Sequence, residues 1–149
     1  MELKIKALSP KIGRELPLPA FATDGAAAMD LCACIDAPVV IPAGTRTVIP
    51  SGIAIALPSS DYVALLFSRS GMGIKSGISL SNSVGVIDSD YRGEIGVGLH
   101  NTSDADYTVN PGDRIAQLMI TPVIRPTVIP VDELPSSERG AGGFGSTGR

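Results

Sequence analysis

The segment IGVGLH at residues 95–100 decides the fold. Its apolar side chains recur at every second position, as in a β-strand with one face in a hydrophobic core. The same period continues with Tyr107 and Val109, and Pro111-Gly112 then marks a turn. An apolar strand pattern follows from Arg114 to about Ile124. These residues therefore predict successive strands joined by short turns.

Working outward, short apolar runs with the same period fill the N-terminal half. Leu3, Ile5 and Ala7 share one face, further runs lie between 48 and 57, and 62–67 is a strongly apolar strand. The chain has 17 glycines and 12 prolines, which separate these runs at short intervals. This pattern predicts an all-β, jelly-roll-like sandwich. We expect at most one very short helix, near Ser68-Arg69-Ser70, with Ser68 as its cap.

The 149 residues predict one domain followed by two extended segments. We expect the β-sandwich to span 1–125. Prolines at 126, 130 and 135 predict a semi-extended arm over 126–138. Residues 139–149 are rich in glycine, and ordering each residue costs about 1–2 kcal/mol. We therefore expect this tail to stay mobile until a ligand binds it.

Composition limits the partners. Net charge is -3, so phosphate binding needs a local cluster of cations, and the scarcity of basic and aromatic residues disfavours nucleic acid. No run approaches the ~20 apolar residues of a membrane span, and the N-terminus lacks the pattern of a signal peptide. Cys32 and Cys34 are interpreted as buried small hydrophobes, which favours a reducing, cytoplasmic location. Charged residues make up only 18% of the chain, and we expect a partner chain to cover some apolar surface.

Two polar stretches could bind an anion or a metal. Asp30 lies in the apolar run Ala26–Leu31, which indicates an acid that faces a site or a metal, or merely a strand-edge acid in water. The sequence SRSG at 68–71 follows the apolar strand and combines a guanidinium with two hydroxyls. At a helix start it would suit an anion, although a surface ion pair is an equal alternative.

The third stretch, residues 81–93, carries the acids best placed for catalysis. Asp88 and Asp90 would lie on one side of an extended chain, where one of them could act as a general base. Tyr91 offers a ring wall, and Asn82 offers a donor and an acceptor to a base edge. Glycines at both ends, residues 85 and 93, suggest the arms of a hairpin. The alternative is a polar hairpin tip.

Two further stretches complete the set. In PGDRIAQ at 111–117, Arg114 and Gln117 could bind phosphate, or they could be strand residues without a binding role. In the tail, the guanidinium groups of Arg139 and Arg149 suit anionic oxygens. Ser146, Thr147 and glycine N–H groups suit phosphate, and Phe144 offers a flat face to a ring. The alternative is a flexible glycine-rich terminus that binds no ligand.

Taken in order, these five stretches resemble the motifs of the trimeric deoxyuridine triphosphate nucleotidohydrolases (dUTPases). The resemblance covers nearly the whole chain. Its most specific parts are GVIDSDYRG at 85–93 and RGAGGFGSTG at 139–148. It implies a jelly-roll homotrimer whose active sites are shared between subunits. It also implies hydrolysis of dUTP to dUMP and pyrophosphate, which supplies the dTTP precursor and limits uracil in DNA.

The resemblance also implies residue roles by position. Asp88 would activate the water that attacks the α-phosphorus, and Asp30 would touch the water shell of Mg²⁺. Asn82 and backbone near Gly85 would contact uracil, with Tyr91 under the deoxyribose. The remaining substrate-binding positions implied are Arg69, Ser70, Gly71, Gln117, Arg139, Phe144, Gly145, Ser146 and Thr147.

Some positions depart from the family's commonest pattern. Alanines replace serine and glycine at Ala26 and Ala28, Ser68 stands where proline is usual, and Ser81 where glycine is common. These changes concern local backbone geometry. A dCTP deaminase and a non-catalytic nucleotide-sensing module on the same fold are the alternative functions. We assign His100, the single histidine, a structural or surface role.

Overall fold

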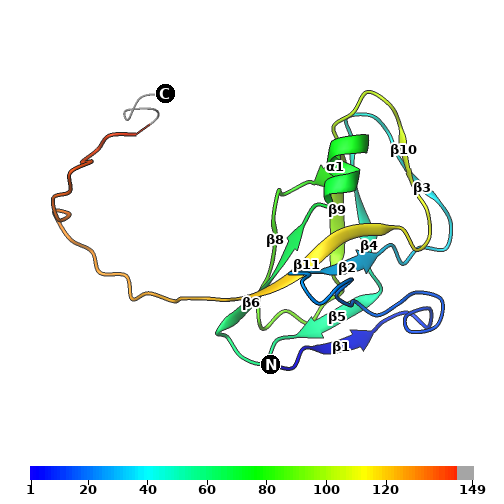
Figure 1. Ribbon diagram of the computed structural model, residues 1–149, viewed down its shortest axis with the longest axis horizontal. Coiled ribbons are helices and arrows are strands. Elements are labelled where there is room, and N and C mark those ends of the chain that lie inside the picture. Colours follow the sequence, from blue (N-terminus) through cyan, green and yellow to red (C-terminus); the bar gives the residue numbers. More distant parts are fainter. Residues whose placement is uncertain (144–149) are drawn as a thin grey trace.

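The computed structural model describes residues 1–143 and shows a β-sandwich with one short helix in that part of the chain (Figure 1). The prediction of an all-β, jelly-roll-like sandwich is confirmed. The elements in chain order are β1 (Lys4–Ala7), β2 (Met29–Cys32), β3 (Val39–Ile41), β4 (Arg46–Pro50), β5 (Ile53–Ala56), β6 (Tyr62–Phe67), α1 (Ser70–Ser76), β7 (Ile78–Leu80), β8 (Gly85–Ile87), β9 (Gly96–Asn101), β10 (Tyr107–Val109) and β11 (Arg114–Pro122).

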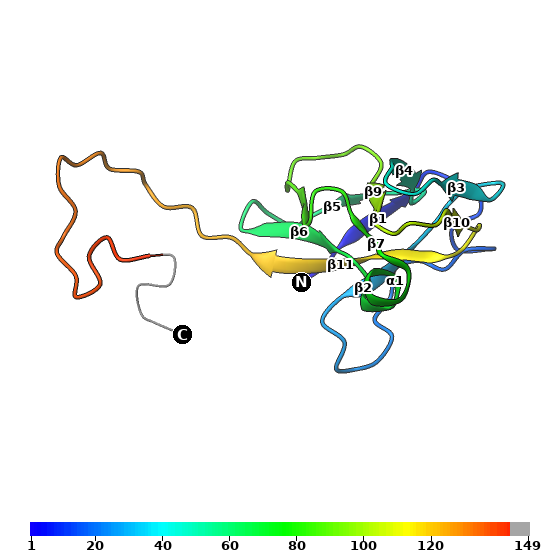
Figure 2. The ribbon, with the colours of Figure 1, turned by 90° about the horizontal axis from the view of Figure 1, so that it is seen from above.

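Two larger sheets form the layers. One has the strand order β2-β11-β6-β8 and the other β4-β9-β7, and every pairing within them is antiparallel. Figure 2 shows β4 and β9 on one side of the molecule and β2 and β11 on the other. The remaining strands form two two-stranded sheets, β1-β5 and β10-β3. Neighbours in a sheet are mostly distant in sequence, as in a jelly roll.

The core lies between the two sheets. Period-two alternation sends Leu31, Leu66 and Leu118 inward from one sheet, and Val97 and Leu99 inward from the other; all five are at most 4% exposed. Each such side chain contributes about 1.5–3 kcal/mol on burial. The alternating pattern at 95–100 therefore places one face of β9 in the core and leaves the opposite face for a cavity.

The helix begins later than predicted, and the expected cap is wrong. Arg69 occupies the N-cap position in an extended conformation, without a side-chain cap hydrogen bond. The Oγ atom of Ser68 instead accepts a hydrogen bond from the backbone N–H of Leu80, at 2.8 Å. Ser68 therefore ties the β6–α1 connection to β7. Gly77 ends the helix with a φ of 67°, a conformation that favours glycine.

The two cysteines are free thiols, and the prediction that both are buried is wrong. Cys32 ends β2 and Cys34 follows it, and both are only partly buried. Burial raises the pKa of the Cys32 thiol, and the nearby Asp30 carboxylate adds to this effect.

An arm leaves the sandwich where β11 ends. The Val123 N–H donates to the Asp61 carbonyl at 2.8 Å, and the chain then runs away from the two sheets (Figure 1). Its apolar side chains are exposed, with Ile124 at 91%, Val128 at 84% and Leu134 at 84%. Within the described residues, no helix is long and apolar enough to cross a membrane.

Candidate active site

A cavity of about 430 Å³ lies beside β8 and β9 and gathers most of the third predicted stretch. Asn82, Gly85, Asp88 and Tyr91 all line it, as expected from the sequence. Leu66, Leu80 and Ile95 contribute apolar wall. The cavity therefore combines an amide, a carboxylate and an aromatic ring against an apolar background, as small-molecule sites commonly do.

Two glycines on β9, Gly96 and Gly98, also line this cavity, and the sequence analysis assigned them no role. A Cβ added at Gly96 would lie 2.9 Å from Val48 Cγ1, and one added at Gly98 would lie 3.2 Å from Ser81 Oγ. A larger residue at Gly98 would thus crowd the turn that carries Asn82, whereas one at Gly96 would crowd Val48 on β4. The sequence did contain a signal for this role, because glycines stand at every second position between the core-facing residues. They leave one face of the strand without side chains.

Asn82 sits in the turn between β7 and β8. The Ser81 N–H donates to the Gly98 carbonyl at 2.8 Å, and the Val84 N–H donates to the Asn82 carbonyl at 2.7 Å. Between them, Ser83 has a φ of 63°, unusual for a residue other than glycine. The turn is therefore tightly constrained next to β9, and it presents Asn82 at the edge of the cavity.

Residues 85–93 do not form the predicted hairpin. β8 pairs with β6, whereas β9, which follows, belongs to the other sheet. The chain turns between them, with the Tyr91 N–H donating to the Asp88 carbonyl at 3.2 Å. Of the two acids that an extended chain would place on one side, Asp88 lines the cavity and Asp90 does not. Asp88 is exposed in the single chain, directly after the buried Ile87.

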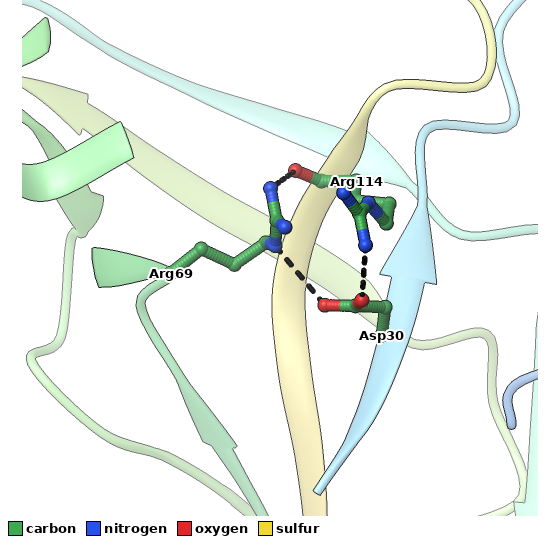
Figure 3. Close-up of polar contacts among 3 residues, drawn as sticks. All are labelled: Asp30, Arg69 and Arg114. Atoms are coloured by element: carbon green, nitrogen blue, oxygen red, sulfur yellow. Dashed lines mark hydrogen bonds and ion pairs between the residues drawn. The ribbon is translucent and has the colours of Figure 1, made fainter. Parts of the chain in front are cut away.

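A second polar cluster lies on the four-stranded sheet. Asp30 lies between two guanidinium groups (Figure 3). Arg69 Nε donates to Asp30 Oδ1 and Arg114 Nη1 donates to Asp30 Oδ2, both at 3.0 Å. Arg69 Nη1 also donates to the Arg114 carbonyl at 3.2 Å. Two cations face one carboxylate, which leaves a local excess of positive charge in a chain of net charge -3. This is the local cation cluster that phosphate binding requires.

Strand register places Gln117 in the same cluster. Gln117 on β11 lies opposite Asp30 on β2 and opposite Phe67 on β6. Arg69 follows Phe67 by two residues, and Ser70 and Gly71 open the helix, where first-turn N–H groups lack intrahelical acceptors. Arg114, which the sequence left open between phosphate binding and strand decoration, belongs to the cluster through its ion pair with Asp30.

The cavity and the cluster remain separate within one chain. None of Asp30, Arg69 and Gln117 lines the cavity. Arg139 is exposed beyond the sandwich, and its Nε donates to the Gly142 carbonyl at 2.7 Å. Predicted sites at Phe144, Gly145, Ser146 and Thr147 lie outside the described residues. One chain thus carries two partial sites.

The acidic residues fit Mg²⁺ only through water. Among residues 1–143, no group of three His, Cys, Asp or Glu side chains could hold a metal ion. Both Asp30 oxygens already accept hydrogen bonds from guanidinium groups. The remaining lone pairs of Asp30 can accept from a water of a hydrated ion, which matches the preference of Mg²⁺ for phosphate oxygens and waters.

Comparison with known proteins agrees with this geometry. The dUTPase family model matches residues 14–148. The deoxyuridine 5'-triphosphate nucleotidohydrolase of Idiomarina loihiensis is 47% identical over 99% of this chain and 98% of its own. The enzyme of the same name from Paraburkholderia phymatum is 49% identical over 100% and 99%. The fold and the two partial sites define a nucleotide-binding β-sandwich, and the chain belongs to the dUTPase family.

Solved structures lead to the same family. The Staphylococcus bacteriophage 80alpha dUTPase with dUPNHPP has a TM-score of 0.86 and 30% identity, and the match covers 99% of both chains. A mutant dUTPase from phage phi11 of S. aureus, whose structure reveals the coordination of a structural Mg(II) ion, has a TM-score of 0.78 and 26% identity. That match covers 91% of this chain and 100% of the phage chain.

Proposed function

We propose that this chain is a dUTP diphosphatase, which hydrolyses dUTP to dUMP and pyrophosphate. The observation that carries the proposal is the cavity that brings Asn82, Asp88 and Tyr91 together in a chain of the dUTPase family. The product dUMP is the precursor of dTTP, and removal of dUTP limits the incorporation of uracil into DNA.

Each cavity residue has a chemical task in this reaction. The Asp88 carboxylate accepts a proton from the water that attacks the α-phosphorus, acting as a general base. Tyr91 packs under the deoxyribose, where a 2′-hydroxyl would collide with the ring. Asn82 offers a donor and an acceptor to the uracil edge. Backbone groups beside Gly85 complete the contact with uracil. Gly85 itself packs against β6, where an added Cβ would be 2.9 Å from Leu66 Cβ.

The cationic cluster binds the triphosphate. Arg69, Arg114 and Gln117 face the phosphate oxygens, and Ser70 and Gly71 add groups at the start of α1. Bound Mg²⁺ would neutralise phosphate charge, and Asp30 would hold it through water. Arg139 and the tail residues Phe144 to Thr147 would close over the nucleotide, because excluding bulk water and fixing the triphosphate favours in-line attack.

We infer that a homotrimer completes the site. The outer face of the four-stranded sheet supports self-association, because Leu65 lies opposite both Met119 and Val86 there, and Val86 is 63% exposed. The exposed apolar side chains of the arm over 126–138 support contact with a neighbouring chain. The free thiols of Cys32 and Cys34 favour a cytoplasmic location.

A panel of nucleotides tests the function. With Mg²⁺, we expect dUTP to release pyrophosphate far faster than dCTP, dTTP or UTP. A hydrogen-bonded base site can discriminate by about 10⁴-fold or more. Equal rates on all four nucleotides would refute the proposal. Release of ammonia from dCTP would indicate a deaminase instead, and binding of dUTP without turnover would indicate a nucleotide-sensing module.

A further inference from the structure

The Tyr91 side chain is held from two directions by its own chain. Its hydroxyl donates a hydrogen bond to the Glu94 carbonyl at 3.0 Å. Its ring lies against Gly93, where an added Cβ would be 2.3 Å from the Tyr91 hydroxyl oxygen and 2.6 Å from Cζ. Tyr91 is nevertheless 47% exposed, so surrounding packing does little to fix the ring. Its orientation depends on where the Glu94 carbonyl is.

The Glu94 carbonyl is fixed by the turn between β4 and β5. The Gly52 N–H donates to Glu94 Oε1 at 2.8 Å. The next residue along, Ile95, donates its N–H to the Ile53 carbonyl at 2.9 Å and accepts from the Ser51 N–H at 3.2 Å. Three hydrogen bonds therefore attach residues 94 and 95 to residues 51–53. The bond to the carboxylate is charge-assisted and so is stronger than a neutral one.

The turn itself has little freedom to move. Gly52 has a φ of 72°, and an added Cβ would lie 2.6 Å from Cys34 Sγ. Its carbonyl accepts a hydrogen bond from the Leu8 N–H at 2.8 Å. Gly52 is thus held between β1 and the segment that follows β2. This rigid turn is a suitable anchor for a side chain that positions another group.

We propose that Glu94 is a positioning residue for sugar recognition. Its carboxylate accepts a hydrogen bond from the Gly52 N–H and, together with the backbone bonds of Ile95, fixes the Glu94 carbonyl. That carbonyl accepts the hydrogen bond from the Tyr91 hydroxyl. Glu94 lines the cavity together with Tyr91 and also lines a second cavity of about 240 Å³ beside Gly52 and Cys34. It therefore bridges the nucleotide site and the anchor. This inference rests on the proposed function of Tyr91 as the wall under the deoxyribose.

The experiment measures discrimination between dUTP and UTP, which differ only at the 2′ position. kcat/KM is determined for both nucleotides with the wild type, Glu94→Ala, Glu94→Gln, Tyr91→Phe and the double variant Tyr91→Phe/Glu94→Ala. We expect Glu94→Ala and Tyr91→Phe each to lower the dUTP/UTP ratio about tenfold, as the loss of one hydrogen bond permits. Glu94→Gln keeps an oxygen acceptor and should stay within about threefold of the wild type.

The double variant shows whether Glu94 and Tyr91 change the dUTP/UTP ratio through the same hydrogen bond or independently of each other. Because both residues act through one hydrogen bond, we expect the double variant to match the single variants in its dUTP/UTP ratio. The matched control is Glu15→Ala, an exposed glutamate outside the cavity, which should keep the wild-type ratio. Thermal unfolding of every variant accompanies the kinetics, because a purely structural role for Glu94 would lower stability and leave the ratio unchanged.

Two results would overturn the inference: a wild-type ratio in Glu94→Ala, or additive losses in the double variant. Tyr91→Phe removes only a hydroxyl from an exposed ring, so it decides the case even if Glu94→Ala does not fold. In that event, a wild-type ratio in Tyr91→Phe overturns the inference. Failure of the underlying function has a different signature, namely a Tyr91→Ala variant that still prefers dUTP over UTP as strongly as the wild type.

Discussion

Ser83 shows how single residues set the geometry of the cavity. Its φ of 63° lies in a region that disfavours residues with a Cβ. Such conformations cost about 1–3 kcal/mol and occur often at functional sites. The sequence offered no signal for this strain, since the turn carries serine and asparagine and no glycine at that position. Asp88, by contrast, was identified from its motif, although its exposure was not.

Replacing Asp88 with asparagine tests the general base. The amide has nearly the same shape but cannot accept the proton from water, so we expect Asp88→Asn to lower kcat by about 10²–10⁴-fold. Affinity should remain within a few-fold of the wild type, as measured by calorimetry with a non-hydrolysable dUTP analogue. Asp90→Asn is the matched control, because Asp90 does not line the cavity. Full activity in Asp88→Asn would assign the base to another group.

Asn101 is a second residue whose role came only from the structure. It is 0% exposed, and its amide nitrogen donates to the Ile41 carbonyl at 2.9 Å and to the Ala105 carbonyl at 2.8 Å. Its Oδ1 accepts from the Ser103 N–H and hydroxyl, at 3.0 and 2.7 Å. Asn101 therefore joins the β9–β10 loop to β3.

We expect Asn101→Ala to lower the free energy of unfolding by about 2–4 kcal/mol, because it leaves the buried Ile41 carbonyl without its donor and removes the bonds to the β9–β10 loop. Urea unfolding measures the change. Asn110→Ala provides the control at an exposed turn, where the expected change is below about 0.5 kcal/mol. Equal effects at the two positions would contradict a special role for Asn101.

At the scale of elements, β8 and β9 show what local patterns leave open. The sequence predicts the strand at 95–100 and only the arms of a hairpin near 85–93, and both β8 and β9 exist. Their alternation determines which side chains face a core. It does not determine the partner strand, and so the predicted hairpin was wrong: β8 joins β6, and β9 joins β4 and β7. The predicted helix cap was wrong for a similar reason, because Ser68 Oγ accepts its hydrogen bond from the backbone N–H of Leu80, which is distant in sequence, and not from the first turn of α1.

The ion pair between Lys11 and Asp36 links the loop after β1 to the loop after β2. The hydrogen bond from Lys11 lowers the pKa of Asp36 below 3.8, and the same bond raises the pKa of Lys11 above 10.5. The Asp36 contribution to stability is present above pH 3.8 and is lost as the pH falls through the folded pKa. The Lys11 contribution is present below pH 10.5 and is lost as the pH rises through the folded pKa.

We therefore expect Asp36→Asn to lower Tm slightly at pH 7, with a difference from the wild type that shrinks as the pH falls below 3.8. The effect is small because the Asp36 side chain is 94% exposed, so that solvent screens the pair. Differential scanning calorimetry from pH 2 to pH 8 measures it. Asp24→Asn, at an exposed turn, serves as the control. A Tm difference that persists unchanged at pH 2 would show that the ion pair is not its cause.

At the scale of the whole molecule, the two partial sites require an explanation. The cavity carries Asp88, and the cationic cluster carries Arg69, yet no residue of the cluster lines the cavity. In the proposed homotrimer, the cavity of one subunit meets the cluster of another. Each complete site then needs Asp88 and Arg69 from different chains.

Mixing two inactive variants tests this arrangement. Asp88→Asn and Arg69→Ala are each expected to be nearly inactive alone. After subunit exchange at equal concentrations, mixed trimers each contain one site with both residues intact, which predicts recovery of about a quarter of the wild-type activity. The same exchange protocol on each variant alone is the control. A mixture as inactive as its components would mean that each subunit builds its own site.

The sequence by itself determined the all-β class, the inward-facing residues of the strands and the identity of the motif residues such as Asp88 and Arg69. These follow from side-chain alternation and residue chemistry, which are local properties of the chain. The tertiary structure alone decided which sheet each strand joins, the contacts of Glu94 behind Tyr91 and the separation of the cavity from the cationic cluster within one chain. Those depend on contacts between residues far apart in sequence, such as Gly52 with Glu94 and Asp30 with Arg114, which no local pattern encodes.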